Sequence, residues 1–169
     1  MANYRIEAVH QVNKWLWTLL KDLPFESTTA FAAYGPSKIN LIPIIPGQQQ
    51  PEFVNIAGGA PFIVYGTGRS SLPQQWWHYR EQCNYIIYDD NEARLRVIQN
   101  YIVDLFNRDD FVTPELNDFV TNTIFEFKSV SFQTSTSISP AESEAGRFGA
   151  SVSVKFEYTE DINQRGLRL

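Results

Sequence analysis

The chain is poor in the residues that crosslink proteins or bind metals. Cysteine occurs once among 169 residues, at Cys83, so no disulfide can form within the chain and nothing implies an oxidising compartment. Histidine occurs twice, at His10 and His78. His78 and Cys83 are five residues apart, but no second pair completes the tetrahedral ligand set of a zinc site. We therefore expect neither a metal ion nor another cofactor.

The residue sets of common catalytic sites are lacking as well. A nucleophile needs a neighbouring base and an orienting group, and Cys83 begins an apolar segment where a small buried side chain is the more common state. No Gly-x-Ser-x-Gly elbow is present. The glycines of Gly66–Ser71 are followed by Ser-Ser-Leu-Pro and not by the Gly-Lys-Ser/Thr of a phosphate-binding loop, which favours a turn after a strand. We expect a protein that is not an enzyme.

Long apolar runs and blocks of one charge are also absent. No stretch approaches the roughly 20 apolar residues of a membrane span, and the first residues lack the basic and apolar regions of a signal peptide. The 14 basic and 19 acidic residues are interspersed, with a net charge of −5. A nucleic-acid-binding protein would concentrate Lys and Arg on one face. We expect a protein made and used in a cytoplasm, without a membrane partner.

Aromatic residues are plentiful by contrast, with 12 Phe, 8 Tyr and 4 Trp making up 14% of the chain. Disordered chains contain few aromatic residues, so we expect a folded protein with a substantial core. Aromatic residues are also enriched at protein interfaces, so part of this excess can serve contacts between subunits. The length suits a single domain spanning residues 1–169.

Two segments have the 3.6-residue periodicity of amphipathic helices. The first extends from about Tyr4 to Lys21, and its apolar face consists of Ala8, Val12, Trp15, Leu16, Leu19 and Leu20. The second ends near Asn107, and its apolar stripe consists of Leu95, Ile98, Ile102 and Leu105, widened by Val97, Tyr101 and Phe106.

Three acidic residues mark the expected start of the second helix. We expect Asp89 to be the N-cap and Glu92 to complete a capping box. The alternative for Asp89 and Asp90 is a cation-binding carboxylate pair, but a cap with favourable helix-dipole contact accounts for both. A third, short helical segment is predicted at Thr113–Glu115, with Thr113 as N-cap and Pro114 as the first helical residue.

Strands are predicted in the remaining apolar segments, which are Pro61–Gly66, Cys83–Tyr88, Ile124–Gln133 and Val152–Tyr158. Ile39–Ile45 is a further candidate that Pro43 limits to an edge or a bent strand. The alternation in Ile124–Gln133 changes phase, which predicts a β-bulge at Lys128–Ser129 and antiparallel pairing with Ser151–Tyr158. Polar connections are expected at Thr67–Gln82, at Thr134–Gly149 as a long arm, and at Thr159–Leu169 as a loose tail.

The order of these elements predicts an α+β fold. We expect a mixed or mostly antiparallel sheet of about four to five strands, with two main helices packed on one face and a long β-hairpin arm.

Two segments are candidate protein interfaces. Trp, Tyr and Arg dominate interaction hot spots, and they cluster at Trp76, Trp77, Tyr79 and Arg80. Adjacent tryptophans in an extended segment point in opposite directions, so we expect one in the core and one at the interface. The alternative is that these rings only cover the sheet edge or pack beside the first helix. The arm adds the candidate interface residues Glu142, Glu144, Arg147 and Phe148.

From about Pro61 to Tyr158 the chain resembles the tail terminator (tail completion) family of tailed bacteriophages. The resemblance lies in the segments PFIVYG, CNYIIYDDNEARLRVIQNYIVDLFN and EFKSVSFQTSTSISPAESEAGRFGASVSVKFEY. It implies a virion protein of the tail or neck, assembled in the host cytoplasm as a ring, usually hexameric. The ring caps the tail tube, stops its polymerisation and provides the head-joining surface. The implied partners are further copies of the chain, the tail tube protein, a neck or head-completion protein and, where the tail has one, a sheath protein. DNA only passes through the lumen.

Three other functions stay open at this stage. Another head–tail connector would occupy the same junction and would share these features. A small enzyme or ligand-binding domain could use the Trp76–Trp77 region as a pocket, which convergent polar groups beside a cavity would favour. A nucleic-acid-binding protein would require a basic groove.

Overall fold

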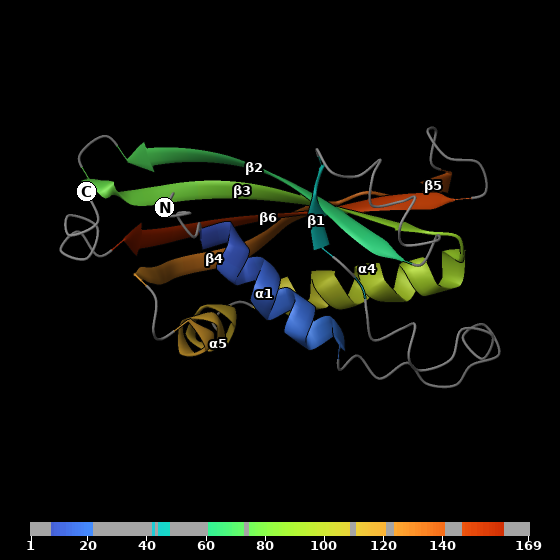
Figure 1. Ribbon diagram of the computed structural model, residues 1–169, viewed down its shortest axis with the longest axis horizontal. Helices are drawn as coiled ribbons and strands as arrows, with labels where there is room; N and C mark the ends of the chain where they lie inside the picture. The colour runs from blue at the N-terminus through green and yellow to red at the C-terminus, as the bar shows by residue number, and fades with distance from the viewer. Residues whose placement is uncertain are drawn as a thin grey trace, which may run out of the picture.

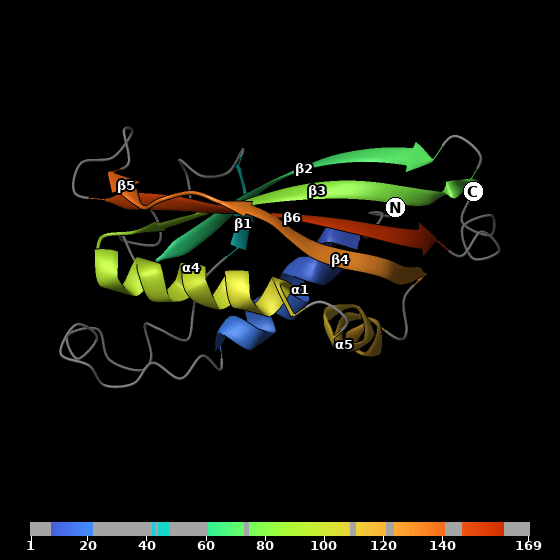
Figure 2. The ribbon, with the colours of Figure 1, turned by 180° about the vertical axis from the view of Figure 1, so that it is seen from behind.

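The computed structural model describes residues 8–21, 42, 44–47, 61–72, 75–108, 111–120, 124–140 and 147–160. A long twisted sheet forms one layer, and three helices form a second layer against one of its faces (Figures 1 and 2). The elements follow in the order α1 (Ala8–Lys21), β1 (Ile44–Pro46), β2 (Phe62–Leu72), β3 (Gln75–Asp89), α4 (Glu92–Phe106), α5 (Val112–Phe119), β4 (Phe125–Ser135), β5 (Ser139–Pro140) and β6 (Phe148–Glu160). The predicted α+β class is confirmed.

The sheet is mixed and largely antiparallel. Its strands lie in the order β1, β2, β3, β6 and β4, and the two-residue strand β5 also pairs with β6. β1 runs parallel to β2, whereas every other pair is antiparallel. In the left half of Figure 1, β2, β3, β6 and β4 lie side by side from top to bottom. β1 is the edge strand that the proline at position 43 predicted, although residue 43 itself lies outside the described residues.

The predicted alternation of the last strand is confirmed. The side chains of β6 that face the helices are buried, namely Val152, Val154, Phe156 and Tyr158. The bulge in β4 is confirmed as well, because the register with β6 shifts between Phe127 and Ser129. Phe127 and Val130 are both buried, which is what one extra residue between them achieves.

The prediction that Thr67–Gln82 is an irregular connection is wrong. β2 and β3 continue through it as a paired hairpin, with Gly66 opposite Asn84 and Ser71 opposite Tyr79, and the register shifts only between Ser71 and Leu72. Gly66 and Gly68 are therefore strand residues and not a turn. The sequence suggested otherwise because this part of β2 has few apolar residues. Strand preference depends on the neighbouring strand, and β3 supplies the buried side chains here.

The long arm at Thr134–Gly149 is not confirmed, because much of its described part belongs to paired strands. β4 extends to Ser135, and β5 pairs with the start of β6, so the hairpin continues to Pro140 opposite Phe148. Gln99 of α4 holds the join between β4 and β5, because its Nε2 donates hydrogen bonds to the carbonyls of Thr136, at 2.7 Å, and Ser151, at 3.3 Å. Thr159 and Glu160 likewise belong to β6 and not to a tail, and residues 161–169 lie outside the described part.

The two long helices bury the faces that their periodicity predicted. Every residue of the predicted α1 face is buried or partly buried against the core, and Leu95, Ile98, Ile102 and Leu105 of α4 are buried. Val97 is an exception, since 39% of it is exposed. α4 ends at the C-cap Asn107 as predicted. The predicted start of α1 at Tyr4 lies outside the described residues.

The starts of α4 and α5 differ from prediction. The N-cap of α4 is Asn91, whose side chain accepts a hydrogen bond from the backbone N–H of Arg94. Asp89 is instead the last residue of β3, and its carboxylate accepts hydrogen bonds from Nε and Nη2 of Arg94. α5 begins at Val112 with Phe111 as N-cap, two residues before the predicted N-cap Thr113. The sequence pattern could not show that Asp89 is required as a buried partner for Arg94.

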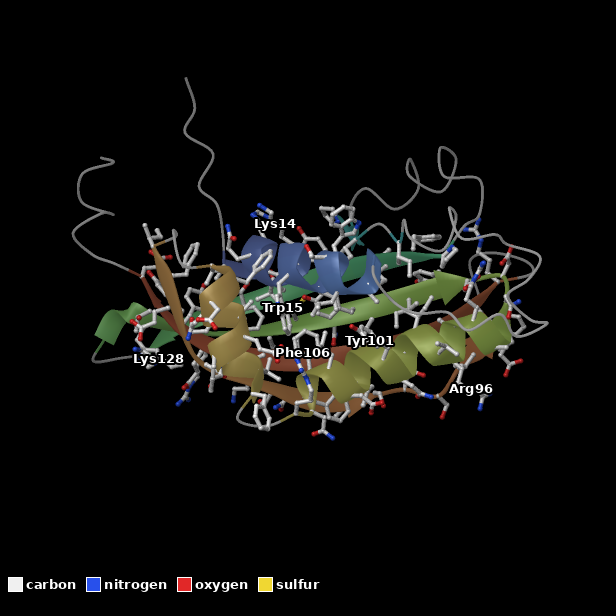
Figure 3. All side chains as sticks on the ribbon, turned by 90° about the horizontal axis from the view of Figure 1, so that it is seen from below. Lys14, Trp15, Arg96, Tyr101, Phe106 and Lys128 are labelled. Atoms are coloured by element: carbon white, nitrogen blue, oxygen red, sulfur yellow. The ribbon has the colours of Figure 1, made fainter. Side chains whose placement is uncertain are left out.

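One continuous core fills the space between the helices and the sheet. The rings of Trp15 in α1 and Phe106 in α4 meet edge to face at 5.8 Å between centroids, as Figure 3 shows from the helical side. Beneath them, Tyr85 of β3 donates a hydrogen bond from its hydroxyl to Oδ1 of Asn13, at 2.7 Å. These contacts join both long helices to the central strand.

No helix among the described residues is long and apolar enough to cross a membrane.

Candidate assembly surface

The sheet face opposite the helices carries polar side chains in rows that cross four strands. The strand registers place residues of β2, β3, β6 and β4 side by side in three rows, which are Gly66–Asn84–Ser153–Thr134, Gly68–Gln82–Lys155–Ser131 and Ser70–Arg80–Glu157–Ser129. A fourth row, without β2, contains His78, Thr159 and Glu126. We call this set of residues, together with the bulge residue Lys128, the polar face. Its members are all polar residues or glycine.

Four charged side chains on the polar face form ion pairs with one another, whereas Lys155 is exposed and forms no salt bridge with a described residue. Nε of Arg80 bonds to the carboxylate of Glu157 across the β3–β6 pair, and Nε2 of His78 lies 3.9 Å from the same carboxylate. Nζ of Lys128 donates to Oε1 of Glu126 at 2.6 Å. Because Arg80 and Lys128 each lie beside a carboxylate, this face carries little uncompensated positive charge. It is unsuited to tight binding of phosphate groups.

The outer edge of β2 is covered over only part of its length. β1 pairs with β2 from Ile63 to Tyr65. From Gly66 to Leu72, no strand in the described part of the chain pairs with this edge. Gly66 and Gly68 are exposed, and a Cβ added to either would meet nothing within 4 Å. Among the described residues, the backbone of β2 is therefore uncovered at Gly66 and Gly68.

The outer edge of β4, on the other side of the sheet, is also partly covered. Asn117 of α5 bonds to both backbone groups of Phe127, accepting from its N–H at 2.7 Å and donating to its carbonyl at 2.8 Å. Beyond the bulge, from Ser129 to Ser135, no other described strand or helix residue is bonded to this edge. As far as the described residues show, each outer edge of the sheet has one closed and one open stretch.

α5 presents exposed aromatic side chains close to the β4 edge. Phe111, at its N-cap, is 70% exposed, and Phe119, at its last turn, is 37% exposed. α5 packs against β4, and Figure 2 shows it below the end of that strand.

The predicted interface residues do not form a single cluster. Tyr79 and Arg80 lie near one end of β3, whereas Phe148 is paired with Asp89 at its other end. Ten residues of β3 separate Tyr79 from Asp89, which corresponds to roughly 33 Å along a strand. Trp76 and Trp77 belong to β3 near Tyr79, but their side chains lie outside the described part of the structure.

Most of the described candidates pack within their own chain. Tyr79 is buried, and its ring stacks on Tyr158 at 5.5 Å between centroids. The guanidinium of Arg147 lies 5.4 Å from the ring centroid of Phe62, and Phe148 packs against the core. Only Arg80 is exposed, on the polar face. Glu142 and Glu144 lie outside the described residues.

The residues examined for metal binding or nucleophilic chemistry are apart or buried. Cys83 is fully buried on the helical side of β3, and burial raises the pKa of its thiol to about 12, so a thiolate is disfavoured. His78 lies on the opposite face of the same strand, beside Glu157. Within the described ranges, no three side chains of His, Cys, Asp or Glu are grouped as metal ligands.

Sequence inspection missed the features that give this surface its shape. Asn117, Gly66, Gly68 and Ser131 carry no recognisable motif, and their significance depends on strand pairs far apart in the chain. The one available signal was compositional. Ser and Gly are frequent in the outer strands, which indicates small side chains where another backbone can approach.

Compared with protein-family models and with curated proteins, the chain matches none.

Proposed function

We propose that the protein is a structural subunit of the tailed-bacteriophage neck, where copies of it form a ring that caps the tail tube, ends its polymerisation and offers the surface to which the head joins. The proposal starts from the resemblance of residues 61–158 to tail terminators. The observation that carries it furthest is the polar face. It is a polar surface on the sheet face opposite the helices, and its Arg80 and Lys128 are each paired with a carboxylate.

A ring built from such subunits has a preferred orientation. Helices occupy more width than a sheet, because side chains surround each helix and neighbouring strands are only about 4.8 Å apart. The helical layer therefore fits the larger outer circumference, and the polar face fits the inner one. In the proposed ring, the rows of the polar face line the channel.

The chemistry of the polar face suits a channel through which DNA passes. Tight contact with DNA needs cations that neutralise phosphates, and it releases counterions. Here the guanidinium of Arg80 bonds to Glu157, and the ammonium of Lys128 bonds to Glu126. Serine, threonine and amide side chains around them offer hydration without strong attraction. DNA can then move past the wall without being held.

Deleting the gene from the phage that carries it tests the function. We expect tail tubes of uncontrolled length that do not join heads, with normal particles restored by the wild-type chain supplied in trans. Electron micrographs of the lysates give both the tube lengths and the fraction joined to heads.

Two results would contradict the proposal. Tails of normal length that do not join heads would assign the chain to another head–tail connector. Normal infectious particles would remove it from the neck altogether. Immunogold labelling of wild-type particles provides an independent check, since the proposed subunit must be present in several copies at the head-proximal end of the tail.

A further inference from the structure

We infer that copies of this chain join edge to edge, with β4 of one copy pairing antiparallel with β2 of the next to continue the sheet around the ring. The inference rests on the proposed ring and adds the surface that closes it. The occupant of each open edge is a second copy of the same chain. Its pairing segments are Gly66–Ser70 of β2 and Ser129–Thr134 of β4.

The two open edges lie at the same level of the sheet. Following the registers across β3 and β6, Gly66 is level with Thr134, Gly68 with Ser131, and Ser70 with Ser129. A copy placed beside the first, without sliding along the strands, therefore sets one open edge against the other. Such a coincidence is not needed for the fold of one chain.

The stretches that flank these edges are closed. β1 covers β2 up to Tyr65, just before Gly66. Asn117 covers β4 at Phe127, just before the bulge that precedes Ser129. Soluble proteins usually protect a sheet edge with Lys, Pro, a bulge or a covering element. Covering elements occur here on both edges, and no described element covers the stretches that match. β4 has a second register shift between Phe132 and Thr134, at the far end of its open stretch.

The sequences of the two segments fit close backbone approach. Gly66–Ser70 and Ser129–Thr134 contain no proline, lysine or carboxylate. Each open segment alternates small residues that lie on the polar face, with Gly66 and Gly68 on one edge and Ser129 and Ser131 on the other. Strands in contact at these positions would place no large or like-charged side chains opposite one another on that face.

Strand direction agrees with this arrangement. β2 and β6 are both antiparallel to β3, and β4 is antiparallel to β6, so β4 and β2 run in opposite directions within one chain. Rotation about a ring axis that runs along the strands preserves their direction. β4 of one copy therefore meets β2 of the next as an antiparallel neighbour. The contact is heterologous, as a closed ring of identical subunits requires.

Five or six residues of strand pairing bury little area compared with a stable interface, which usually buries about 800 Å² on each partner. The exposed aromatic rings of α5 can add to it. Phe111 and Phe119 belong to the helix that packs beside β4, so a neighbour bound at that edge would also reach α5. In the proposed ring, this second contact region would cover Phe111, which is 70% exposed in the single chain.

Cysteine pairs across the proposed contact test it. Antiparallel neighbours place Cα atoms about 4.5–5.5 Å apart, within the range that a disulfide spans. Gly68→Cys is combined in turn with Ser129→Cys, Ser131→Cys and Thr134→Cys, so that a shift of one row is also detected. Position 68 has space for the new side chain, and buried Cys83 does not compete. Mild oxidation is applied to the purified protein and to assembled particles.

We expect one of the three pairs to crosslink, and G68C with S131C is the pair that the registers favour. On a non-reducing denaturing gel, the monomer band should then become a series of bands that ends at the copy number of the ring. Each single variant should remain monomeric under denaturing conditions. The matched control is G68C with E126C, two rows away and beside the edge that Asn117 closes. Circular dichroism confirms that every variant is folded.

Three outcomes would overturn edge pairing. The first is an intact ring in which none of the three pairs crosslinks, and the second is equal crosslinking in the control. The third is a dimer formed by S131C alone, which would indicate two-fold β4–β4 pairing. A crosslinked ring that fails to limit tube length would leave edge pairing standing and contradict the proposed function. The two proposals can therefore fail separately.

Discussion

Asn117 and Phe127 are joined by two hydrogen bonds that imitate a neighbouring strand. The side-chain amide of Asn117 in α5 accepts from the backbone N–H of Phe127 and donates to its carbonyl. The residues are ten positions apart, so the contact also fastens α5 to the outer strand. This one side chain decides where the open edge of β4 begins.

We predict that Asn117→Ala lowers the free energy of unfolding by about 1–3 kcal/mol, because both backbone groups of Phe127 lose their partners. Urea unfolding followed by tryptophan fluorescence measures the change. The matched control is Asn100→Ala, on the exposed side of α4, where alanine's higher helix propensity should leave stability unchanged or slightly raised. Equal effects of the two substitutions would show that Asn117 does not protect the edge.

The buried ion pair between Asp89 and Arg94 gives a second prediction. Arg94 is fully buried, and burial raises the pKa of Asp89 while the hydrogen bonds from Arg94 oppose that shift. Arg94→Met should cost about 3–5 kcal/mol, because it leaves a buried carboxyl group without its partner. Chemical denaturation at neutral pH measures the loss.

An exposed pair on the same helix serves as the control for this prediction. Arg96 bonds to Glu92 at 3.2 Å on the surface of α4, and Figure 3 shows Arg96 on the outer side of the helix. Arg96→Met should cost no more than about 0.5 kcal/mol. Adding Asp89→Leu to Arg94→Met should recover part of the loss, since no buried charge then remains. No recovery would mean that packing, not charge, dominates at this position.

The buried thiol of Cys83 predicts how stability changes at high pH. Burial raises its pKa in the folded protein from 9.0 to about 12. The unfolded chain therefore loses this proton from about pH 9 upward, whereas the folded chain retains it. The contribution of Cys83 to stability is complete below pH 9 and is lost as the pH rises toward 12.

We predict that Cys83→Ala shows a shallower fall in the free energy of unfolding between pH 9 and 11 than the wild-type protein, although it is less stable at pH 7 by about 1 kcal/mol. Burial and then Cys83 raise the pKa of Tyr85, so the difference between the two proteins reports on Cys83 together with its effect on Tyr85. A thiol reagent should react with wild-type protein only at the rate of unfolding. Parallel curves for the two proteins, or rapid labelling of the folded state, would contradict the assignment.

Phe111→Ser separates folding from assembly. Serine is a preferred N-cap residue and phenylalanine is not, so the monomer should keep its stability or gain up to about 1 kcal/mol. If the ring buries this side chain, self-association should weaken by about 1.5–3 kcal/mol per contact, which is tenfold or more. Analytical ultracentrifugation or the concentration dependence of the native mass measures it. Val97→Ser, which alters an exposed apolar residue of α4, should leave association unchanged, and an equal loss there would rule out a specific role for α5.

The sequence by itself determined the elements whose burial leaves a local pattern. One side of α1, α4 and β6 faces the core, and an apolar residue is therefore required at every third or fourth position of a helix and every second position of a strand. The bulge in β4 was predictable for the same reason, because an inserted residue changes the phase of that pattern. From these elements and their order, the α+β class and the largely antiparallel sheet followed.

Tertiary structure alone decided the features that depend on pairing between distant segments. Gly66 and Ser71 became strand residues because β3 bonds to them, despite their weak intrinsic preference. Asp89 became a buried partner of Arg94 because the end of β3 turns directly into α4 beneath the core. Whether the two open edges lie at the same level depends on the pairing registers of all four strands. No single segment of the sequence specifies all of these registers. A local sequence pattern indicates which side of a helix or strand is buried. Only the assembled sheet shows which backbone N–H and C=O groups are left for hydrogen bonds to another molecule.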